Sequence, residues 1–165
     1  MRHLLPILLA LALLPTTADA GKHHRRADRD VLVVRDGSSA EWSETIQETV
    51  DDWNAVMPGG GPVLVYQRDT TACYESTVCS GDTFGFLAYA TWGTNEKYGR
   101  VVLSWLIADP DARERIICHE FGHILTHQGD DYGAYPDQSC MWGYLKDPGP
   151  IDIQLLQDRF GGEPA

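Results

Sequence analysis

Short runs of apolar, often β-branched residues predict strands in the first two thirds of the chain. Residues 31–34 and residues 63–66 are such runs, and polar or turn residues follow each of them. Residues 84–92 form an apolar and aromatic run, and residues 99–107 are rich in β-branched residues, so both are expected to be extended. Between them, residues 73–79 are expected to be a polar loop with a cysteine at each end.

Apolar residues recur with helical spacing in two longer segments. Residues 39–56 carry four large apolar side chains three or four positions apart, which predicts an amphipathic helix that ends before Pro58. A second helix is predicted to begin at Asp109, because its carboxylate can cap the helix and Pro110 suits the first helical position. This helix is expected to continue to Gly129.

The C-terminal part of the chain predicts a turn and a last helix. Residues 139–143 (SCMWG) are expected to form a compact turn. Residues 151–160 are amphipathic and predict a final helix, with Ile151, Leu155 and Phe160 directed toward the core.

The N-terminus is typical of an exported protein. Residues 1–20 have a basic start, an apolar run at 4–14 and small residues before the expected cleavage after Ala20, as in a signal peptide. The apolar run is shorter than the roughly 20 residues that span a bilayer. The polar residues 21–30 are expected to be a lead-in or a short pro-segment, and residues 31–165 one domain.

The charge of the chain argues against two classes of binding partner. The formal net charge of −11 argues against a nucleic acid or an anionic membrane, since both attract a basic surface. We therefore expect a secreted, extracellular protein that is monomeric and has no stable association with a membrane or with nucleic acid.

The segment CHEFGH at residues 118–123 carries the most informative motif of the chain. His119 and His123 are four residues apart, so on a helix both rings lie on one face and can reach a single metal ion. Glu120 is placed to take a proton from a water molecule on that ion. Imidazole ligands with an open coordination position are typical of catalytic zinc, so the motif predicts a hydrolase.

The four cysteines are expected to form two disulfides, because exported chains rarely keep cysteines free. Cys73 and Cys79 enclose a loop of five residues. Cys118 directly precedes the first histidine of the motif, and Cys140 lies in the turn at 139–143. Of the three connectivities we favour Cys73–Cys79 with Cys118–Cys140.

With a methionine in the turn downstream, the motif resembles that of the metzincins, a clan of zinc endopeptidases. The chain is more similar to their small secreted bacterial branches, matrixin-like and snapalysin-like, than to the large animal enzymes. The resemblance covers about residues 31–162 and rests on four features in matching order: His119-Glu120-x-x-His123, the turn at Met141, the last helix IDIQLLQDRFGG and the early helix ending Trp53-Asn54.

The resemblance implies an α+β fold with a twisted, mostly parallel sheet, a central zinc-binding helix and a small C-terminal subdomain below the cleft. It implies one Zn²⁺ ion held by His119, His123 and a third ligand, with Glu120 as general base and Met141 as the floor of the site. The implied activity is the hydrolysis of peptide bonds in protein or peptide substrates. We expect the substrate to lie as an extended strand along residues 99–104.

The third ligand cannot be taken directly from the family pattern. That pattern places glycine three residues and a ligand six residues after the second histidine, where this chain has Thr126 and Gly129. A turn at Gly129 would return Asp130 to the metal, and aspartate is the third ligand in the snapalysin-like branch. Asp130 is therefore favoured, with His127 and Asp131 as alternatives.

Two other functions remain open at this point. One is another secreted zinc hydrolase, such as an amidase that acts on cell-wall peptides. The other is a non-catalytic secreted module in which a fourth protein ligand closes the zinc site. A calcium site also stays open, although no residue pattern supports it.

Overall fold

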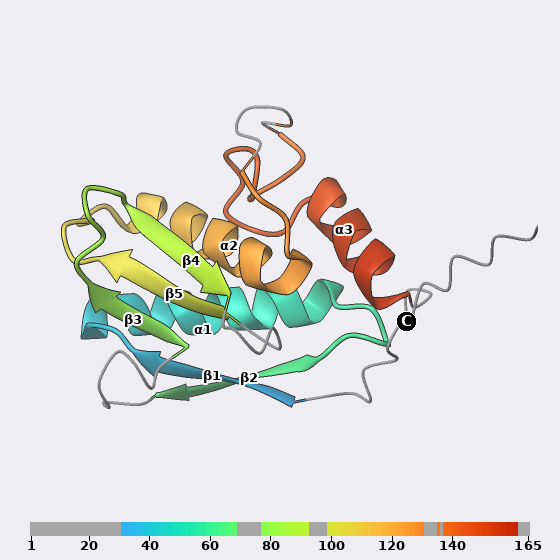
Figure 1. Ribbon diagram of the computed structural model, residues 1–165, viewed down its shortest axis with the longest axis horizontal. Helices are drawn as coiled ribbons and strands as arrows, with labels where there is room; N and C mark the ends of the chain where they lie inside the picture. The colour runs from blue at the N-terminus through green and yellow to red at the C-terminus, as the bar shows by residue number, and fades with distance from the viewer. Residues whose placement is uncertain (1–30, 69–76, 93–98, 131–134, 136, 162–165) are drawn as a thin grey trace, which may run out of the picture.

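The computed structural model describes residues 31–68, 77–92, 99–130, 135 and 137–161, which form one α/β domain (Figure 1). Its helices and strands follow one another along the chain in this order: β1 (Val31–Gly37), α1 (Ala40–Val56), β2 (Val63–Arg68), β3 (Val78–Gly81), β4 (Ala88–Trp92), β5 (Gly99–Ser104), α2 (Pro110–Thr126) and α3 (Pro150–Phe160).

The five strands form one mixed sheet in the order β2-β1-β3-β5-β4. The pairs β1–β2, β1–β3 and β3–β5 are parallel, and only β4 runs antiparallel to its neighbour β5. The expectation of a mostly parallel sheet is therefore confirmed. Because α1 connects the parallel neighbours β1 and β2, the domain is better classed as α/β than as the expected α+β.

Helices α1 and α2 pack against each other on one face of the sheet (Figure 1). The apolar spacing predicted for α1 is confirmed, because its four large apolar side chains all lie in the core: Trp42, Ile46, Val50 and Trp53. Helix α2 supplies the other half of this layer through contacts with β4 and β5. This packing places the motif helix in the centre of the domain.

The end of α1 is tied to the sheet by one side chain. Asn54 donates from Nδ2 to the carbonyl of Leu64 and accepts from the amide of Leu64 at Oδ1, both at 2.8 Å. A side-chain amide that replaces a backbone partner in this way satisfies both polar groups of a residue in β2. The Trp53-Asn54 pair thus has two structural roles, one in the core and one at the strand.

The strands differ from the predictions in their extent, and β1 and β2 both continue beyond the predicted residues 31–34 and 63–66. β3 was not predicted: it begins within the last two residues of the expected loop at 73–79, where Val78 and Cys79 are buried and pair with β5. β4 begins only at Ala88, since residues 84–87 form a turn before it. β5 ends at Ser104 rather than at residue 107, and the two residues that follow it are exposed.

The position of β5 contradicts the substrate path expected along residues 99–104. β5 pairs with β3 on one side and with β4 on the other, so its main-chain groups already have partners. Among the described strands, β4 is the edge strand on this side of the sheet. A substrate strand that joined the sheet next to the motif helix would have to pair with β4.

The last helix forms as predicted but presents a different face to the core. Leu156 and Asp152 are fully buried, whereas Ile151 and Leu155 are only half-buried. Phe160 is partly buried and packs against the core, as expected. The prediction followed apolar residues alone, and the buried carboxylate of Asp152 shifts the inward face by one residue.

The disulfide Cys118–Cys140 is present as predicted and joins α2 to the turn at 139–143. Cys79 is also disulfide-bonded. Its expected partner, Cys73, lies outside the described residues, as do the expected signal peptide and lead-in at residues 1–30. A disulfide is typical of proteins in oxidising compartments. In the described part of the chain, no helix is long and apolar enough to cross a membrane.

Removing this disulfide should destabilise the fold. The two cysteines are 22 residues apart, and closing a loop of this size is worth about 3 kcal/mol by the chain-entropy estimate. We expect the double variant Cys118→Ala, Cys140→Ala to lose about that much free energy of unfolding in urea titrations. An unchanged denaturation midpoint would contradict the prediction.

Candidate metal centre

The motif helix α2 starts as the sequence predicts. Asp109 is its N-cap and accepts a hydrogen bond from the amide of Asp111 at 3.1 Å, with Pro110 in the first turn. Both histidines of the motif are nearly fully buried. The helix therefore presents a polar face within a buried layer.

The end of α2 differs from the prediction. The helix stops at Thr126 and not at Gly129, and His127 follows in the left-handed conformation with φ 58°. Arg159 of α3 donates a hydrogen bond to the carbonyl of Leu125. This carbonyl would otherwise need an amide from a further helical turn as its partner. The chain can therefore turn immediately after Thr126.

This early turn brings Asp130 to the two histidines of the motif. Asp130 Oδ1 lies 3.2 Å from His119 Nε2 and 3.0 Å from His123 Nε2. The two Nε2 atoms are 2.9 Å apart, and the rings stand nearly perpendicular to each other. His119, His123 and Asp130 thus form a group whose ligand atoms could hold one metal ion.

Backbone hydrogen bonds orient both rings. His123 Nδ1 lies 2.7 Å from the carbonyl oxygen of Gln128, which can only accept, so this nitrogen is the donor, while Nε2 lies near His119 and Asp130. His119 hydrogen-bonds to the backbone of Cys140 and Met141. Such partners orient metal-binding imidazoles and leave the other nitrogen as the ligand atom.

Burial also favours the neutral form of His119. Burial is the main cause that lowers the pKa of His119, and the charge of His123 lowers it further. Asp130 and the two backbone hydrogen bonds act in the opposite direction but do not outweigh burial. A neutral imidazole has the lone pair that a metal ligand needs.

The other two candidates for the third ligand do not join this group. His127 is exposed, and its Nε2 lies 3.0 Å from Arg159 Nη2, which donates to it. It is absent from the group of candidate ligands found among the described residues. Asp131 lies outside the described residues.

The donor set fits a zinc ion. Two imidazole nitrogens and one carboxylate oxygen are typical of zinc sites, with bond lengths of about 2.0–2.2 Å. A tetrahedral ion with such bonds separates its ligand atoms by about 3.3–3.4 Å. The separations of 2.9–3.2 Å between the three ligand atoms are within a few tenths of an ångström of that value.

Like the three candidate ligands, the side chain of Glu120 favours binding of a cation at this site. Its side chain is buried, and Oε2 has no hydrogen-bond partner in the described part of the protein. Burial, together with the negative charge of Asp130, raises the pKa of Glu120 to about 8. A cation held by Asp130 would oppose the second effect and favour the ionised carboxylate.

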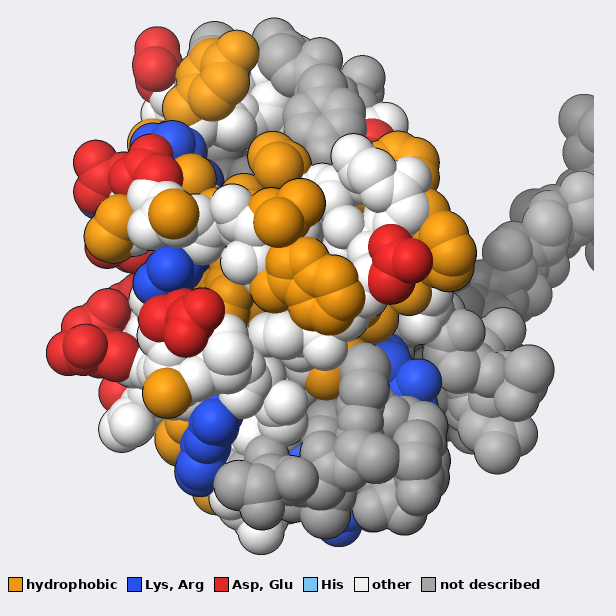
Figure 2. Space-filling view, turned by 90° about the vertical axis from the view of Figure 1, so that its left-hand side faces the viewer, with side chains coloured by type: hydrophobic (Ala, Val, Ile, Leu, Met, Phe, Trp, Pro, Cys, Tyr) orange, Lys and Arg blue, Asp and Glu red, His pale blue; other side chains and the backbone are white. Residues whose placement is uncertain are grey.

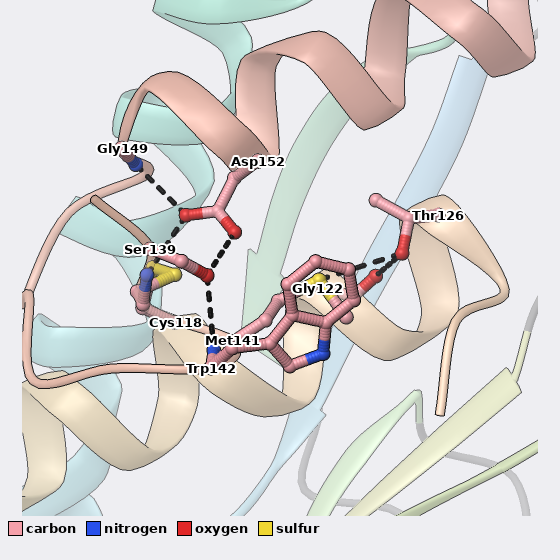
Figure 3. The surroundings of a disulfide bond; sticks show 9 residues. Cys118, Gly122, Thr126, Ser139, Met141, Trp142, Gly149 and Asp152 are labelled. Carbon is pink, nitrogen blue, oxygen red and sulfur yellow. Dashed lines mark hydrogen bonds between the residues drawn. A yellow bond between two sulfur atoms is a disulfide. The ribbon is translucent and has the colours of Figure 1, made fainter. Parts of the chain in front are cut away.

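Met141 lies against α2, beside Gly122 and Thr126 (Figure 3). Its side chain is fully buried, and Thr126 Oγ1 lies 3.4 Å from its sulfur. A Cβ atom built on Gly122 would lie 2.1 Å from Met141 Cγ and 2.6 Å from Sδ. Gly122 thus permits the close approach of the methionine to the motif helix.

A buried carboxylate of α3 holds the turn that carries Met141 (Figure 3). Asp152 accepts hydrogen bonds from Ser139 Oγ at 2.6 Å and from the amides of Cys140 and Gly149 at 2.8 Å. Ser139 Oγ also accepts from the amide of Trp142 at 2.9 Å. Together with the disulfide, these bonds connect the turn to both α2 and α3.

Gly122→Ala should be destabilising for this reason. The added methyl group would overlap Met141 near the base of its side chain, where it cannot simply rotate away. Overpacking of this kind costs about 1–3 kcal/mol, so we expect a lower midpoint in thermal and urea unfolding. Gly129→Ala is a matched control, because a Cβ atom there would meet nothing within 4 Å. Equal stability of the two variants would contradict the prediction.

Several residues that shape the site escaped the sequence-based prediction. Trp142 Nε1 donates to the carbonyl of Gly129 at 3.0 Å, which anchors the residue next to Asp130. Asp152 had a local signal, because an acidic residue at the third position of a helix often caps it. Arg159 had none, since its partners lie more than 30 residues away.

The candidate metal site opens into a cleft of about 540 Å³. Its walls come from the turn before β4, from β4, from α2 and from the loop after α2: Phe84, Phe86, Ala88, Tyr89, Ala90, His119, Glu120, His123, Gly129 and Asp130. The candidate ligands and Glu120 therefore face a space that a substrate could enter, next to the edge strand of the sheet.

Comparison with known proteins identifies no family for this chain. The chain matches no protein-family model and no curated protein sequence. The structure itself shows an α/β domain with a mixed five-strand sheet and a His-His-Asp group that could hold a metal ion.

Proposed function

We propose that the protein is a zinc-dependent endopeptidase, exported from the cell, that hydrolyses peptide bonds with Glu120 as general base. The observation that carries this proposal is the convergence of His119, His123 and Asp130 beside a buried Glu120 in one cleft. This arrangement combines metal ligands, a proton acceptor and access for substrate. A purely structural role for these residues would not require the last two.

An open coordination position distinguishes a catalytic from a structural zinc site. Among the described residues, no fourth histidine, cysteine or acidic side chain joins the group of three. His127, the other described candidate for the third ligand, hydrogen-bonds with Arg159. These two observations favour catalysis over a closed structural site.

Each residue of the site has a separate task in the proposed reaction. When bound, zinc would polarise the scissile carbonyl and lower the pKa of the attacking water. Glu120 would accept a proton from that water and transfer it to the leaving amine. The hydrogen bond from His123 to Gln128 and those from His119 to the turn keep both rings oriented. Met141 would form the floor under the two rings.

The proposed substrate path follows β4. Among the described strands this one pairs with β5 alone, and Ala88, Tyr89 and Ala90 line the cleft. An extended peptide could add to the free edge of β4 by main-chain hydrogen bonds, which would hold it across the candidate metal site. This path replaces the one expected along β5.

Metal analysis combined with digestion of unfolded casein tests the proposal. The chain beginning at Gly21, loaded with zinc, should contain about one zinc per chain and should degrade casein. A chelator should abolish the activity, and added zinc should restore it. Release of stem peptides from peptidoglycan without casein cleavage would favour the amidase, and stoichiometric zinc without hydrolysis would favour the non-catalytic module.

A further inference from the structure

Five large apolar side chains are exposed at one end of the sheet. Their exposed fractions lie between 63% and 81%, which is unusual for such residues in close proximity. They come from the turn before β4 and from the segment after β5: Phe84, Phe86, Leu87, Trp105 and Leu106. We call these five residues the apolar rim. Figure 2 shows the face at this end of the molecule, where hydrophobic side chains gather across the centre.

The two segments of the apolar rim lie next to each other because of the β4–β5 pairing. Ala88 pairs with Leu103, and the amide of Ser104 donates to the carbonyl of Leu87 at 2.9 Å. The amide of Leu106 in turn donates to Ser104 Oγ at 3.2 Å. The rim is therefore one surface and not two separate exposed loops.

The backbone of the turn before β4 holds Phe84 in an unfavourable conformation. Phe84 has φ 53°, a region that aromatic residues rarely adopt. Asp82 Oδ1 accepts from the amide of Phe84 at 2.9 Å, and Thr83 bonds to Phe86 through both its hydroxyl and its carbonyl. A strained residue held by its surroundings and exposed to solvent points to a role in binding.

The apolar rim is continuous with the cleft of the candidate metal site. Phe84 and Phe86, from the turn before β4, line the same cleft as the candidate ligands. Trp105 and Leu106 extend the same apolar surface beyond the cleft. Acidic side chains border the hydrophobic area (Figure 2), and the net charge of −11 disfavours anionic lipid as an occupant.

We propose that the apolar rim binds aromatic and aliphatic side chains of an extended polypeptide substrate, outside the bond to be cleaved. The proposal rests on the proposed function, because the substrate strand along β4 would lead directly onto the rim. Apolar side chains are exposed in unfolded protein and buried in folded protein. The preferred substrates are therefore unfolded segments that are rich in apolar residues.

Binding to an inactive variant tests the rim without cleavage. The probe is a fluorescein-labelled peptide of twelve residues with phenylalanine at alternate positions, compared with a matched peptide that has serine there. Zinc-loaded Glu120→Gln should bind the phenylalanine peptide about tenfold more tightly in fluorescence anisotropy, as expected for one buried aromatic side chain. Adding Leu106→Ser or Phe86→Ser should remove most of this preference.

Tyr144→Ser is the matched control, because Tyr144 is 74% exposed but belongs neither to the cleft nor to the apolar rim. It should leave the preference unchanged. Equal affinity for the two peptides, or a preference that survives both rim substitutions, would overturn the proposal. So would a dimer in light scattering, or binding to phosphatidylcholine vesicles, that Leu106→Ser abolishes.

The test separates failure of the rim from failure of the proposed function. Zinc-loaded protein that cleaves both peptides with equal kcat/KM would reject the rim and leave the peptidase activity standing. A retained preference in binding, without hydrolysis of either peptide by the unsubstituted chain, would support the rim and reject the catalytic proposal.

Discussion

Glu120→Gln is expected to lower the rate of casein hydrolysis by roughly 10²–10⁴ while the protein keeps its fold and its zinc. Glutamine has nearly the same shape as glutamate but cannot accept the proton of the attacking water. Glu120 does not belong to the group of candidate ligands, so its replacement should not remove the metal. Steady-state kinetics and zinc analysis on the same preparation measure both expectations.

The pH dependence of stability provides an independent measurement on the same residue. Burial and Asp130 raise the pKa of Glu120 to about 8 in the metal-free protein, from an ordinary value of 4.5. The folded state therefore binds one proton more than the unfolded state between these two values, and stability falls as the pH rises through this window. Metal-free Glu120→Gln should melt higher than the unsubstituted chain at pH 8 and similarly at pH 4.

Glu44→Gln is a suitable control for the kinetic measurement. Glu44 is an exposed residue of α1 and lies outside the cleft, so the substitution should change neither hydrolysis nor zinc content. Near-normal turnover in Glu120→Gln with full zinc content would remove Glu120 from the mechanism. Loss of zinc in this variant would instead show that Glu120 supports the metal site.

Asp130→Ala is expected to lose zinc, whereas His127→Ala should keep it. Asp130 Oδ1 lies within 3.2 Å of both imidazole nitrogens, and His127 hydrogen-bonds with Arg159 outside the group. Removal of a direct ligand should weaken zinc binding by more than the about 10–100-fold that outer-shell partners contribute. Competition with a chromophoric chelator measures the two affinities.

The unfolding midpoints of the metal-free variants serve as the control for this comparison. Asp130 is about half exposed, so its replacement should have little effect on the metal-free fold. Full zinc occupancy in Asp130→Ala, together with metal loss in His127→Ala, would reverse the assignment. If neither variant loses zinc, Asp131 becomes the remaining candidate for the third ligand.

The core of the candidate site was predictable because it depends on local geometry. His119 and His123 share a face of any helix that contains them, since four residues make about one turn. The capping residue Asp109 and the spacing of Trp42, Ile46, Val50 and Trp53 are equally local signals, and the structure confirms all of them. Cys118–Cys140 was predicted from the positions of the cysteines beside the motif and in the turn.

Other features required partners that are distant in the sequence. β3 has only four residues and little apolar pattern, and it becomes a strand because β1 and β5 pair with it on either side. The inward face of α3 depends on Asp152, a carboxylate that is buried only because it binds the turn at 139–143. A pattern of apolar residues carries no information about such a contact.

The third candidate ligand shows what the sequence determines and what the tertiary structure adds. The sequence by itself determined which residues were candidates for the third metal ligand, because acidic residues and a histidine closely follow the second histidine of the motif. The tertiary structure brings Asp130, and not His127, close to the two histidines, since Arg159 of α3 binds both a terminal carbonyl of α2 and the ring of His127. The helix therefore ends at Thr126, His127 turns toward α3, and Asp130 reaches the two histidines. The physical reason is that helix spacing is set by neighbouring residues, whereas a helix end depends on which distant group satisfies its last carbonyls.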